Sequence, residues 1–325
     1  FVRRIGPSDD ALPVVLAAAG SGPTLVVVPA VDVARILAAR LRRAGLSVAL
    51  VPQDWARAAG GVDVVVGARA AAWAPCPGLA AAVVVDEHDE SLQEERSPTW
   101  HARDVVLERA RRAGAPCVLV SPCPTVTGLA AVAQRLVRPA ISDERASWPI
   151  VEVVDRSRDE PWKTSLVTSP LIAHLRHPDR TVVCVHNTPG RGRVLACRAC
   201  RELARCETCE AAVALADDAT FVCRRCGTVR PQVCARCGAS AFANLRPGVT
   251  RLREELEAAA GRPVVAVTGA DEETPTAGIY VGTEAVLHRV RHADVVAFLD
   301  LDTELLAPRY RAAEQAMALL VRGAR

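Results

Sequence analysis

Four C-x-x-C pairs near the middle of the sequence constrain its structure more than any other feature. Eight of the twelve cysteines belong to them, in the order Cys197/Cys200, Cys206/Cys209, Cys223/Cys226 and Cys234/Cys237. A C-x-x-C turn places two thiolates on one side of a metal ion, and zinc prefers four soft donors in a tetrahedron. The sequence therefore predicts two structural Zn²⁺ ions per chain, each bound by four cysteines.

The spacing between the pairs indicates which cysteines share an ion. Thirteen residues separate the second pair from the third, which suits a β-hairpin with arms at residues 211–215 and 220–223 and a turn at 216–219. A hairpin favours a nested arrangement, with Cys206, Cys209, Cys223 and Cys226 on one ion and Cys197, Cys200, Cys234 and Cys237 on the other. Spacing alone leaves a cross-braced arrangement open.

The alternative interpretation of these cysteines is a set of buried thiols or reversible disulfides. Cytosolic chains rarely concentrate C-x-x-C pairs without metal, so we favour zinc. An all-cysteine site is closed, whereas catalytic zinc keeps one coordination position open. The predicted role of the metal is to fold this segment, with roughly 10–16 kcal/mol per structural ion.

Composition and charge limit the other classes of function. The longest apolar runs fall short of a bilayer-spanning helix, and the sequence shows no secretory-leader pattern, so we expect a cytoplasmic fragment or an incomplete reading frame, with no membrane partner. The formal charge of +3 would become about −1 with eight thiolates and two Zn²⁺ bound. Any basic surface must therefore be local, and residues 190–240 contain nine arginines against five acidic residues.

The rest of the sequence alternates short β-branched runs with helical patterns. Predicted strands lie at residues 25–29, 47–52, 62–67, 83–85, 117–121, 150–155, 181–186, 264–267, 278–282 and 295–299. Predicted helices lie at 31–44, 101–112, 125–137, 170–176, 249–260 and 308–321. Val-rich strands alternating with helices indicate an α/β fold whose parallel sheets are covered on both faces.

We predict a first lobe at 1–140, a polar linker near 138–148, a second lobe split into 150–195 and 245–325, and a two-zinc insert at 196–240.

Several segments resemble the replication-restart helicase family of PriA, the primosomal protein N prime. The strongest resemblance is the cysteine run together with the helix that follows it, at 197–257. Six further segments are similar to motifs of the family. In the first half of the chain, VVGARA at 65–70 is similar to V-G-T-R-S-A, EHD at 87–89 to the end of D-E-E-H-D, WHARD at 100–104 to Y-H-A-R-D, and SPCPT at 121–125 to S-A-T-P-S. In the second half, GTE at 282–284 is similar to G-T-Q, and YRAAE at 310–314 is similar to F-R-A-x-E.

This resemblance implies two RecA-like helicase lobes, with the double zinc-ribbon-like insert in the second. It supports the nested assignment of the cysteines. It also implies that the family's fork-binding domains would precede Phe1.

The nucleotide site of that family is degenerate in this sequence. A P-loop needs G-x-x-x-x-G-K-[ST], but the single lysine, Lys163, lies outside any glycine loop, and Pro23 takes the lysine position in the glycine-bearing segment 19–24. In the acidic box (residues 85–89), Val85 stands where the family's magnesium-holding aspartate would be, although a one-residue slip could bring in Asp86. We interpret His88 and His101 as partly exposed polar residues, and the alternative is that they are remnant contacts between this box and the DNA channel. We predict no catalytic and no nucleotide-binding residue.

The resemblance therefore favours a PriA-like protein of replication restart that lacks ATPase activity. Such a protein would bind stalled or abandoned forks, or single-stranded DNA, and would promote primosome assembly and loading of the replicative helicase. One alternative is an active ATP-dependent 3′–5′ DNA helicase with an unorthodox nucleotide site. Another is a zinc-stabilised protein-interaction module with no role on DNA.

Overall fold

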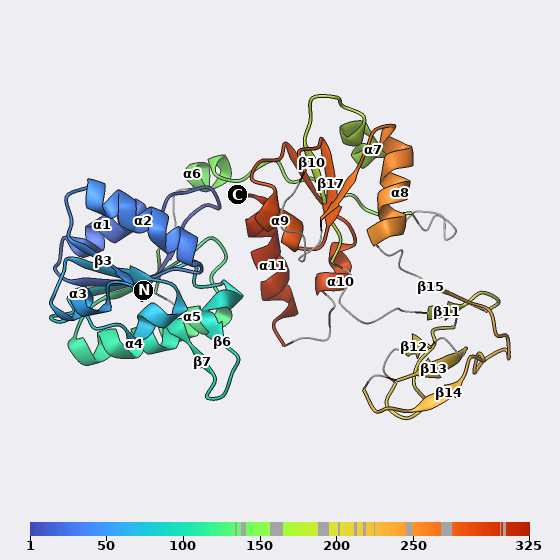
Figure 1. The fold of residues 1–325 in the computed structure, drawn as a ribbon, viewed down its shortest axis with the longest axis horizontal. Helices are drawn as coiled ribbons and strands as arrows, with labels where there is room; N and C mark the ends of the chain where they lie inside the picture. Colours follow the sequence, from blue (N-terminus) through green and yellow to red (C-terminus); the bar gives the residue numbers. More distant parts are fainter. Residues whose placement is uncertain are drawn as a thin grey trace. The chain divides into compact units, whose positions relative to one another are not determined.

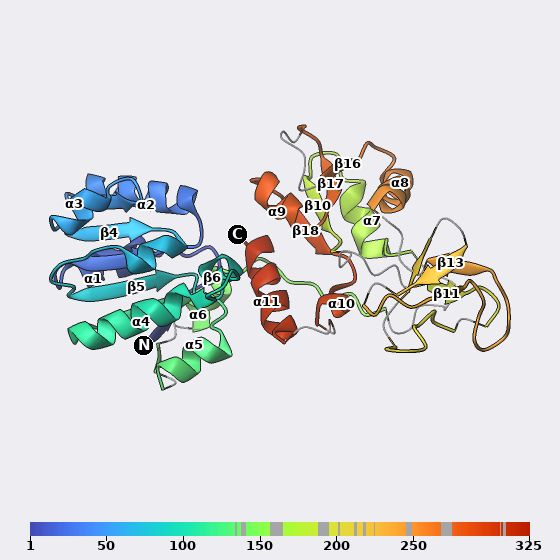
Figure 2. The ribbon, with the colours of Figure 1, turned by 60° about the horizontal axis from the view of Figure 1, so that its bottom comes forward.

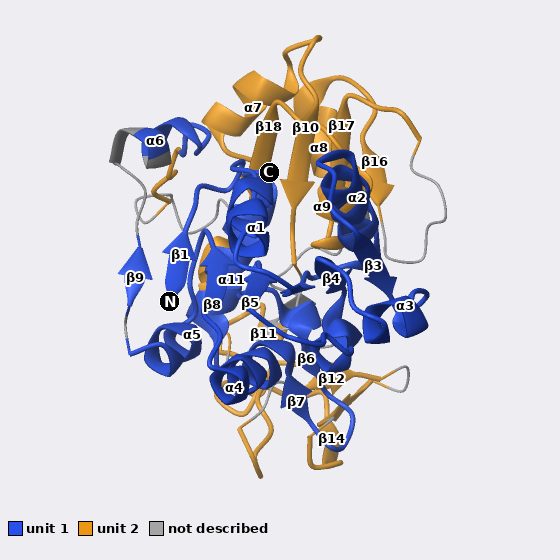
Figure 3. Ribbon diagram, turned by 90° about the vertical axis from the view of Figure 1, so that its left-hand side faces the viewer, with its two compact units in different colours: residues 1–151, 308–325 blue, residues 152–307 orange. Residues whose placement is uncertain are grey.

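The chain forms two compact units in the computed structural model, coloured separately in Figure 3. Unit 1 comprises Phe1–Val151 and Pro308–Arg325, and unit 2 comprises Glu152–Ala307. The structure describes residues 1–133, 135–137, 141–156, 165–187, 195–200, 202–210, 213–216, 219–223, 225–244, 249–267, 275–305, 307 and 310–325.

Unit 1 is built on a parallel β-sheet. Its strands are β1 (Val2–Arg4), β2 (Thr24–Val27), β3 (Val48–Val51), β4 (Val64–Gly67), β5 (Ala81–Val85), β8 (Cys117–Ser121) and β9 (Leu136–Val137). Their order across the sheet is β3-β4-β2-β5-β8-β1-β9, and every neighbouring pair is parallel. A small antiparallel pair, β6 (Gln93–Glu94) and β7 (Trp100–His101), follows the acidic box.

Helices cover both faces of this sheet. The helices of unit 1 are α1 (Leu12–Ala19), α2 (Val31–Arg43), α3 (Trp55–Ala59), α4 (Ala102–Ala113), α5 (Val126–Ala131), α6 (Ile141–Ala146) and α11 (Ala312–Gly323), with 3₁₀ turns η1 (Arg69–Trp73) and η2 (Glu90–Leu92). Figure 1 shows α1 and α2 on one side of the strands and α4 on the other.

The alternating direction of strand side chains explains this double layer. Leu25 and Val27 of β2 face the core formed with α3, η1 and α4, whereas Val26 and Val28 face the core formed with α1 and α2. Because both faces are buried, the strands are continuously apolar. This confirms the predicted α/β class with a parallel sheet.

Unit 2 contains a second parallel sheet, with order β16-β17-β10-β18. Its strands are β10 (Val182–Val185), β16 (Val265–Val267), β17 (Ile279–Gly282) and β18 (Val295–Phe298), and its helices are α7 (Ser169–Leu175), α8 (Val249–Ala260), α9 (Ala285–Arg289) and α10 (Leu301–Leu305). Leucines of α7 and α8 pack on one face, and Val286 of α9 packs on the other. Figure 2 shows α7 and α8 on the opposite side of the strands from α9.

The cysteine-rich segment belongs to unit 2 and lies in the chain between β10 and α8, in yellow in Figure 1. The strands β11 (Leu195–Cys197) and β15 (Phe242–Asn244) pair antiparallel, so the segment enters and leaves side by side. Between them, β12 (Ala214–Leu215), β13 (Thr220–Val222) and β14 (Val229–Pro231) form a three-stranded antiparallel sheet. We call residues 195–244 the insert.

Some sequence expectations differ from the structure. Residues 150–155, expected to form a strand, have no strand pairing, and the expected helix at 125–137 ends at Ala131. The region predicted as a linker contains α6, and α11 groups with unit 1, whereas the predicted second lobe extended through residue 325. Lys163 and residues 217–218 of the predicted turn lie outside the described residues. Within the described part of the chain, every helix is too short or too polar to cross a membrane.

Candidate metal centres and the acidic-box cluster

The eight cysteines of the insert gather into two groups of four, each of which could hold a metal ion. The outer group is Cys197, Cys200, Cys234 and Cys237, and the inner group is Cys206, Cys209, Cys223 and Cys226. Within each group all the sulfur atoms lie within 4.8 Å of one another. The membership of the groups is the one that the nested arrangement predicts, while zinc itself stays a prediction.

The sulfur spacing fits a tetrahedral thiolate site. In the outer group, Cys197 Sγ lies 3.5 Å from Cys237 Sγ, and Cys200 Sγ lies 3.5 Å from Cys234 Sγ. The inner group repeats this spacing between Cys206 and Cys226 and between Cys209 and Cys223. Zn–S bonds of 2.3 Å in a tetrahedron would separate the sulfurs by about 3.8 Å. The donors are thus chemically and geometrically suited to zinc.

Tight turns present the cysteine pairs. The residue after the second cysteine has a positive φ in the three pairs where the structure describes it: 57° at Glu210, 78° at Gly227 and 73° at Gly238. In each case the amide of that residue donates a hydrogen bond to the carbonyl of the first cysteine of the pair, over 2.8–3.0 Å. Glycine adopts this conformation without strain, so the two C-x-x-C-G sequences encode the turn directly.

The ionisation of the thiols is uneven without a cation. Burial raises the pKa of Cys206, but hydrogen bonds from the Thr208 and Cys209 amides and from neighbouring thiols lower it to about 6. At Cys200 a backbone hydrogen bond lowers the pKa, while burial and the surrounding thiols raise it to about 12. Four adjacent thiolates repel one another, so full ionisation requires a bound cation. Bound zinc would supply that charge and would fix the four turns.

The remaining four cysteines do not join a metal group among the described residues. Burial raises the pKa of Cys117, Cys123 and Cys184 to about 12 and also raises the pKa of Cys76. Cys117 and Cys184 are buried, whereas Cys76 and Cys123 are half-buried.

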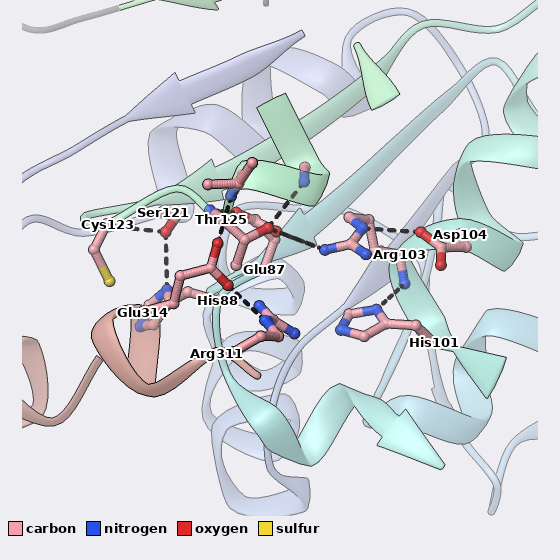
Figure 4. Close-up of polar contacts among 12 residues, drawn as sticks. Glu87, His88, His101, Arg103, Asp104, Ser121, Cys123, Thr125, Arg311 and Glu314 are labelled. Carbon is pink, nitrogen blue, oxygen red and sulfur yellow. Dashed lines mark hydrogen bonds and ion pairs between the residues drawn. The ribbon is translucent and has the colours of Figure 1, made fainter. Parts of the chain in front are cut away.

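A second polar cluster forms at the carboxyl end of β5, centred on Glu87 (Figure 4). The Glu87 carboxylate is completely buried and accepts hydrogen bonds from the Thr125 amide (2.6 Å), the Thr125 hydroxyl (2.9 Å) and Arg103 Nη1 (3.2 Å). Arg103 also donates to the Thr125 hydroxyl over 3.1 Å. We call Glu87, Arg103 and Thr125 the Glu87 cluster.

The Glu87 cluster joins three parts of unit 1. Thr125 caps α5 by accepting a hydrogen bond from the Gly128 amide, and Arg103 lies in the first turn of α4. A Cβ atom at Gly128 would lie 2.7 Å from the Glu87 carboxylate, so glycine permits α5 to approach this closely. The satisfied bonds and complete burial indicate that Glu87 holds β5, α4 and α5 together.

The two histidines that the sequence singles out lie beside this cluster. His101 caps α4 by accepting a hydrogen bond from the Arg103 amide, and burial together with the Arg103 charge lowers its pKa to about 4. His88 Nδ1 lies 2.9 Å from Ser121 Oγ, and burial lowers its pKa. Both residues are buried, so the expectation of partly exposed side chains is wrong.

The other carboxylates of the acidic box are paired with arginines at the end of the chain. Asp86 accepts hydrogen bonds on both oxygens from Arg325, one of them 2.8 Å long, and has a φ of 52°. Asp89 lies 3.4 Å from Arg322. Earlier in the same segment, Glu314 of α11 accepts a hydrogen bond from the Val126 amide over 2.8 Å. The box is therefore covered by α11 and the residues after it.

Sequence reasoning did not identify Arg103, Thr125 or the α11 contacts as members of this site. The sequence did contain a signal for these residues, because Arg103 and Thr125 occur inside the PriA-like motifs at 100–104 and 121–125. The motif at 310–314 supplies Glu314 to the same region. The motif at 282–284 lies in unit 2, where the Glu284 amide donates to Asn187 Oδ1 over 2.6 Å.

Comparison with known proteins adds relatives for most of the chain. No protein-family model matches it. A PriA replication restart protein of Mycobacterium leprae is 33% identical over 299 residues, covering 84% of this chain and 45% of that protein. The replication restart proteins PriA of Bacillus subtilis and Haemophilus influenzae are 26% and 24% identical over 80% and 82% of this chain.

The chain is a homologue of the PriA replication restart proteins. It spans less than half of the length of these PriA relatives. The segments that resemble PriA motifs at 87–89, 100–104, 121–125 and 310–314 are far apart in the sequence, yet they meet around the Glu87 cluster (Figure 4).

Proposed function

We propose that this chain acts in DNA replication restart as a PriA-like protein that does not hydrolyse ATP. It would bind forked or single-stranded DNA and promote assembly of the primosome and loading of the replicative helicase. The observation that carries this proposal is similarity to PriA across 84% of the chain, together with eight cysteines gathered into two groups suited to zinc. Two RecA-like helicase lobes with a zinc-bearing insert are the corresponding architecture.

The proposed lack of ATPase activity rests on the state of the acidic box. In P-loop NTPases the magnesium–nucleotide complex is held by a free carboxylate and the P-loop lysine. The sequence has no P-loop, Glu87 is engaged in the buried cluster, and Asp86 is bonded on both oxygens to Arg325. A cation at Asp86 would have to displace this arginine.

DNA binding by the insert is supported by its exposed arginines. Arg198, Arg205 and Arg225 are exposed, and among the described residues no acidic side chain pairs with them. In contrast, Arg230 and Arg236 each lie 3.6 Å from a glutamate. Unpaired guanidinium groups are the ones available to neutralise phosphates.

ATP turnover on forked DNA tests the enzymatic part of the proposal. We expect no stimulation of hydrolysis by the fork and no crosslinking of radiolabelled ATP. Fork-stimulated hydrolysis that Asp86→Asn abolishes would instead establish the alternative, an active helicase with an unorthodox nucleotide site.

Fork affinity measured across a salt series tests the DNA-binding part. We expect the affinity to fall as salt rises, and the triple change Arg198→Gln, Arg205→Gln, Arg225→Gln to reduce the salt slope by about 2–3. The double change Arg111→Gln, Arg112→Gln on α4 is the matched control, because it also removes exposed arginines. No binding at low salt would favour the remaining alternative, a protein-interaction module.

A further inference from the structure

The inner and outer cysteine groups close chain loops of very different length. Thirteen residues separate Cys209 from Cys223 in the inner group, whereas thirty-three separate Cys200 from Cys234 in the outer group. The closure probability of a flexible loop falls as the 3/2 power of its length, which favours closing the inner site first by about fourfold. Once the inner site is closed, only the twelve residues at 201–205 and 227–233 remain to be ordered for the outer one.

The inner group is also built into the packed core of the insert. That core consists of Leu195, Ala204, Cys206, Val213, Phe221 and Cys223, with Cys209 and Phe242 against it. Among the described residues it includes three inner cysteines and none of the outer four. Phe221 contacts Phe242 edge-on with the ring centroids 4.8 Å apart, and Arg230 lies over the Phe221 ring.

A pair of threonine hydroxyls bridges the inner site. Thr228 Oγ1 lies 3.1 Å from Cys226 Sγ, and Thr208 Oγ1 lies 3.2 Å from Thr228 Oγ1. The Thr228 hydroxyl can therefore donate to the exposed Cys226 sulfur while it accepts from Thr208. Hydrogen bonds of this kind hold a ligand in place and commonly change metal affinity by about 10–100-fold.

The outer site has alanines at the equivalent positions. Thr208 lies two residues after Cys206, and Ala199 lies two residues after Cys197. Thr228 and Ala239 likewise follow Cys226 and Cys237 by two residues. The turns match, because the carbonyls of Thr228 and Ala239 accept hydrogen bonds from the Cys223 and Cys234 amides over 2.8 and 2.9 Å. The two sites thus share a backbone design but differ in their hydroxyl groups.

We propose that the insert is a two-tier zinc module, in which the inner site loads first and retains its metal, and the outer site is the labile one. Thr208 and Thr228 are positioning residues that hold Cys226, and they account for most of the difference in zinc release rate between the two sites. This inference rests on the proposed occupation of both sites by zinc. It assigns the two sites different roles. The inner site is the folding nucleus of the insert, and the outer site holds an exchangeable ion where the insert begins and ends.

Release of zinc into an excess of chelator tests the proposal on the full 325-residue chain. Native mass spectrometry counts the two-, one- and zero-zinc species over time, and alkylation of samples taken at each time identifies which cysteines have lost their metal. We expect two phases, with the one-zinc species accumulating and the outer cysteines alkylated first. A single release step, or alkylation of the inner cysteines first, would overturn the proposal.

Reciprocal substitutions test the role of the hydroxyls. The nearly isosteric double change Thr208→Val, Thr228→Val should speed zinc release from the inner site about tenfold and lower the accumulation of the one-zinc species. The matched change Ala199→Thr, Ala239→Thr should slow release from the outer site, and it remains informative if the valine variant does not fold. Unchanged release in both variants would refute the assigned role. A chain that folds without binding any zinc would instead refute the proposed function.

Discussion

The buried Glu87–Arg103 pair offers the sharpest test of how unit 1 is held together. Both side chains are at most 3% exposed, and Arg103 donates to Glu87 and to Thr125. Arg103→Met keeps most of the aliphatic stem but leaves the Glu87 charge buried without a cation. Removing one partner of a buried ion pair typically costs about 3–5 kcal/mol, and we expect a loss of this size in the free energy of unfolding.

The assay is urea unfolding of the full 325-residue chain, followed by circular dichroism. Arg111→Met is the control, because Arg111 lies on the same helix but pairs with Glu108 at the surface, where the loss of an ion pair changes stability little. In a Glu87→Gln background, Arg103→Met should cost at least about 2 kcal/mol less than it does alone, because no buried charge is left unpaired. If Arg103→Met costs no more than Arg111→Met, or if the two changes at the pair are additive, the cluster is not the structural centre that its geometry indicates.

Three further predictions concern single residues. Glu210 has a φ of 57°, so Glu210→Gly should stabilise the metal-loaded insert by about 1 kcal/mol, measured by thermal unfolding; destabilisation would show that this turn is unstrained. Burial first, and the Arg103 charge second, lower the pKa of His101 to about 4, below its ordinary 6.5. Its unfolded form therefore binds more protons between pH 6.5 and 4, and stability should fall as pH falls through this window. His101→Asn, which can still cap α4, should reduce that pH dependence in acid-unfolding curves, and an unchanged curve would contradict the assignment. Finally, Arg325→Gln should increase hydrogen exchange in α11, because Asp86 loses its bidentate partner; exchange equal to that of the parent chain would mean that this ion pair does not hold α11.

The local patterns of the sequence predicted most of the elements. The strands at β2, β3, β4, β5 and β8 lie where valine-rich runs occur, and α2, α4, α7 and α8 lie where the helical patterns occur. Residues 150–155 show the limit of such patterns. Ile150 and Val153 belong to a β-branched run, yet both are fully or almost fully exposed. A strand also needs a neighbour that supplies hydrogen bonds, and the sequence pattern contains no information about that neighbour.

The Glu87 cluster could not be derived from the residues alone for a related reason. Glu87, Arg103 and Thr125 are separated by 15 and 21 residues and lie on three different elements. Each is a common surface residue type when it is considered by itself. Their meeting requires parallel strands whose carboxyl ends lie at the same edge of the sheet, so it is a property of the topology.

The sequence by itself determined the chemistry of the insert, because C-x-x-C turns are local and their spacing already limits which pairs can meet. It also determined the α/β class, since continuous valine runs are stable only inside a sheet covered on both faces. Only the tertiary structure decided which charges are buried and which segment covers the acidic box. Arg322 and Arg325 lie more than 230 residues from Asp89 and Asp86, and ion pairs over such separations form only after the fold has placed both groups at one site.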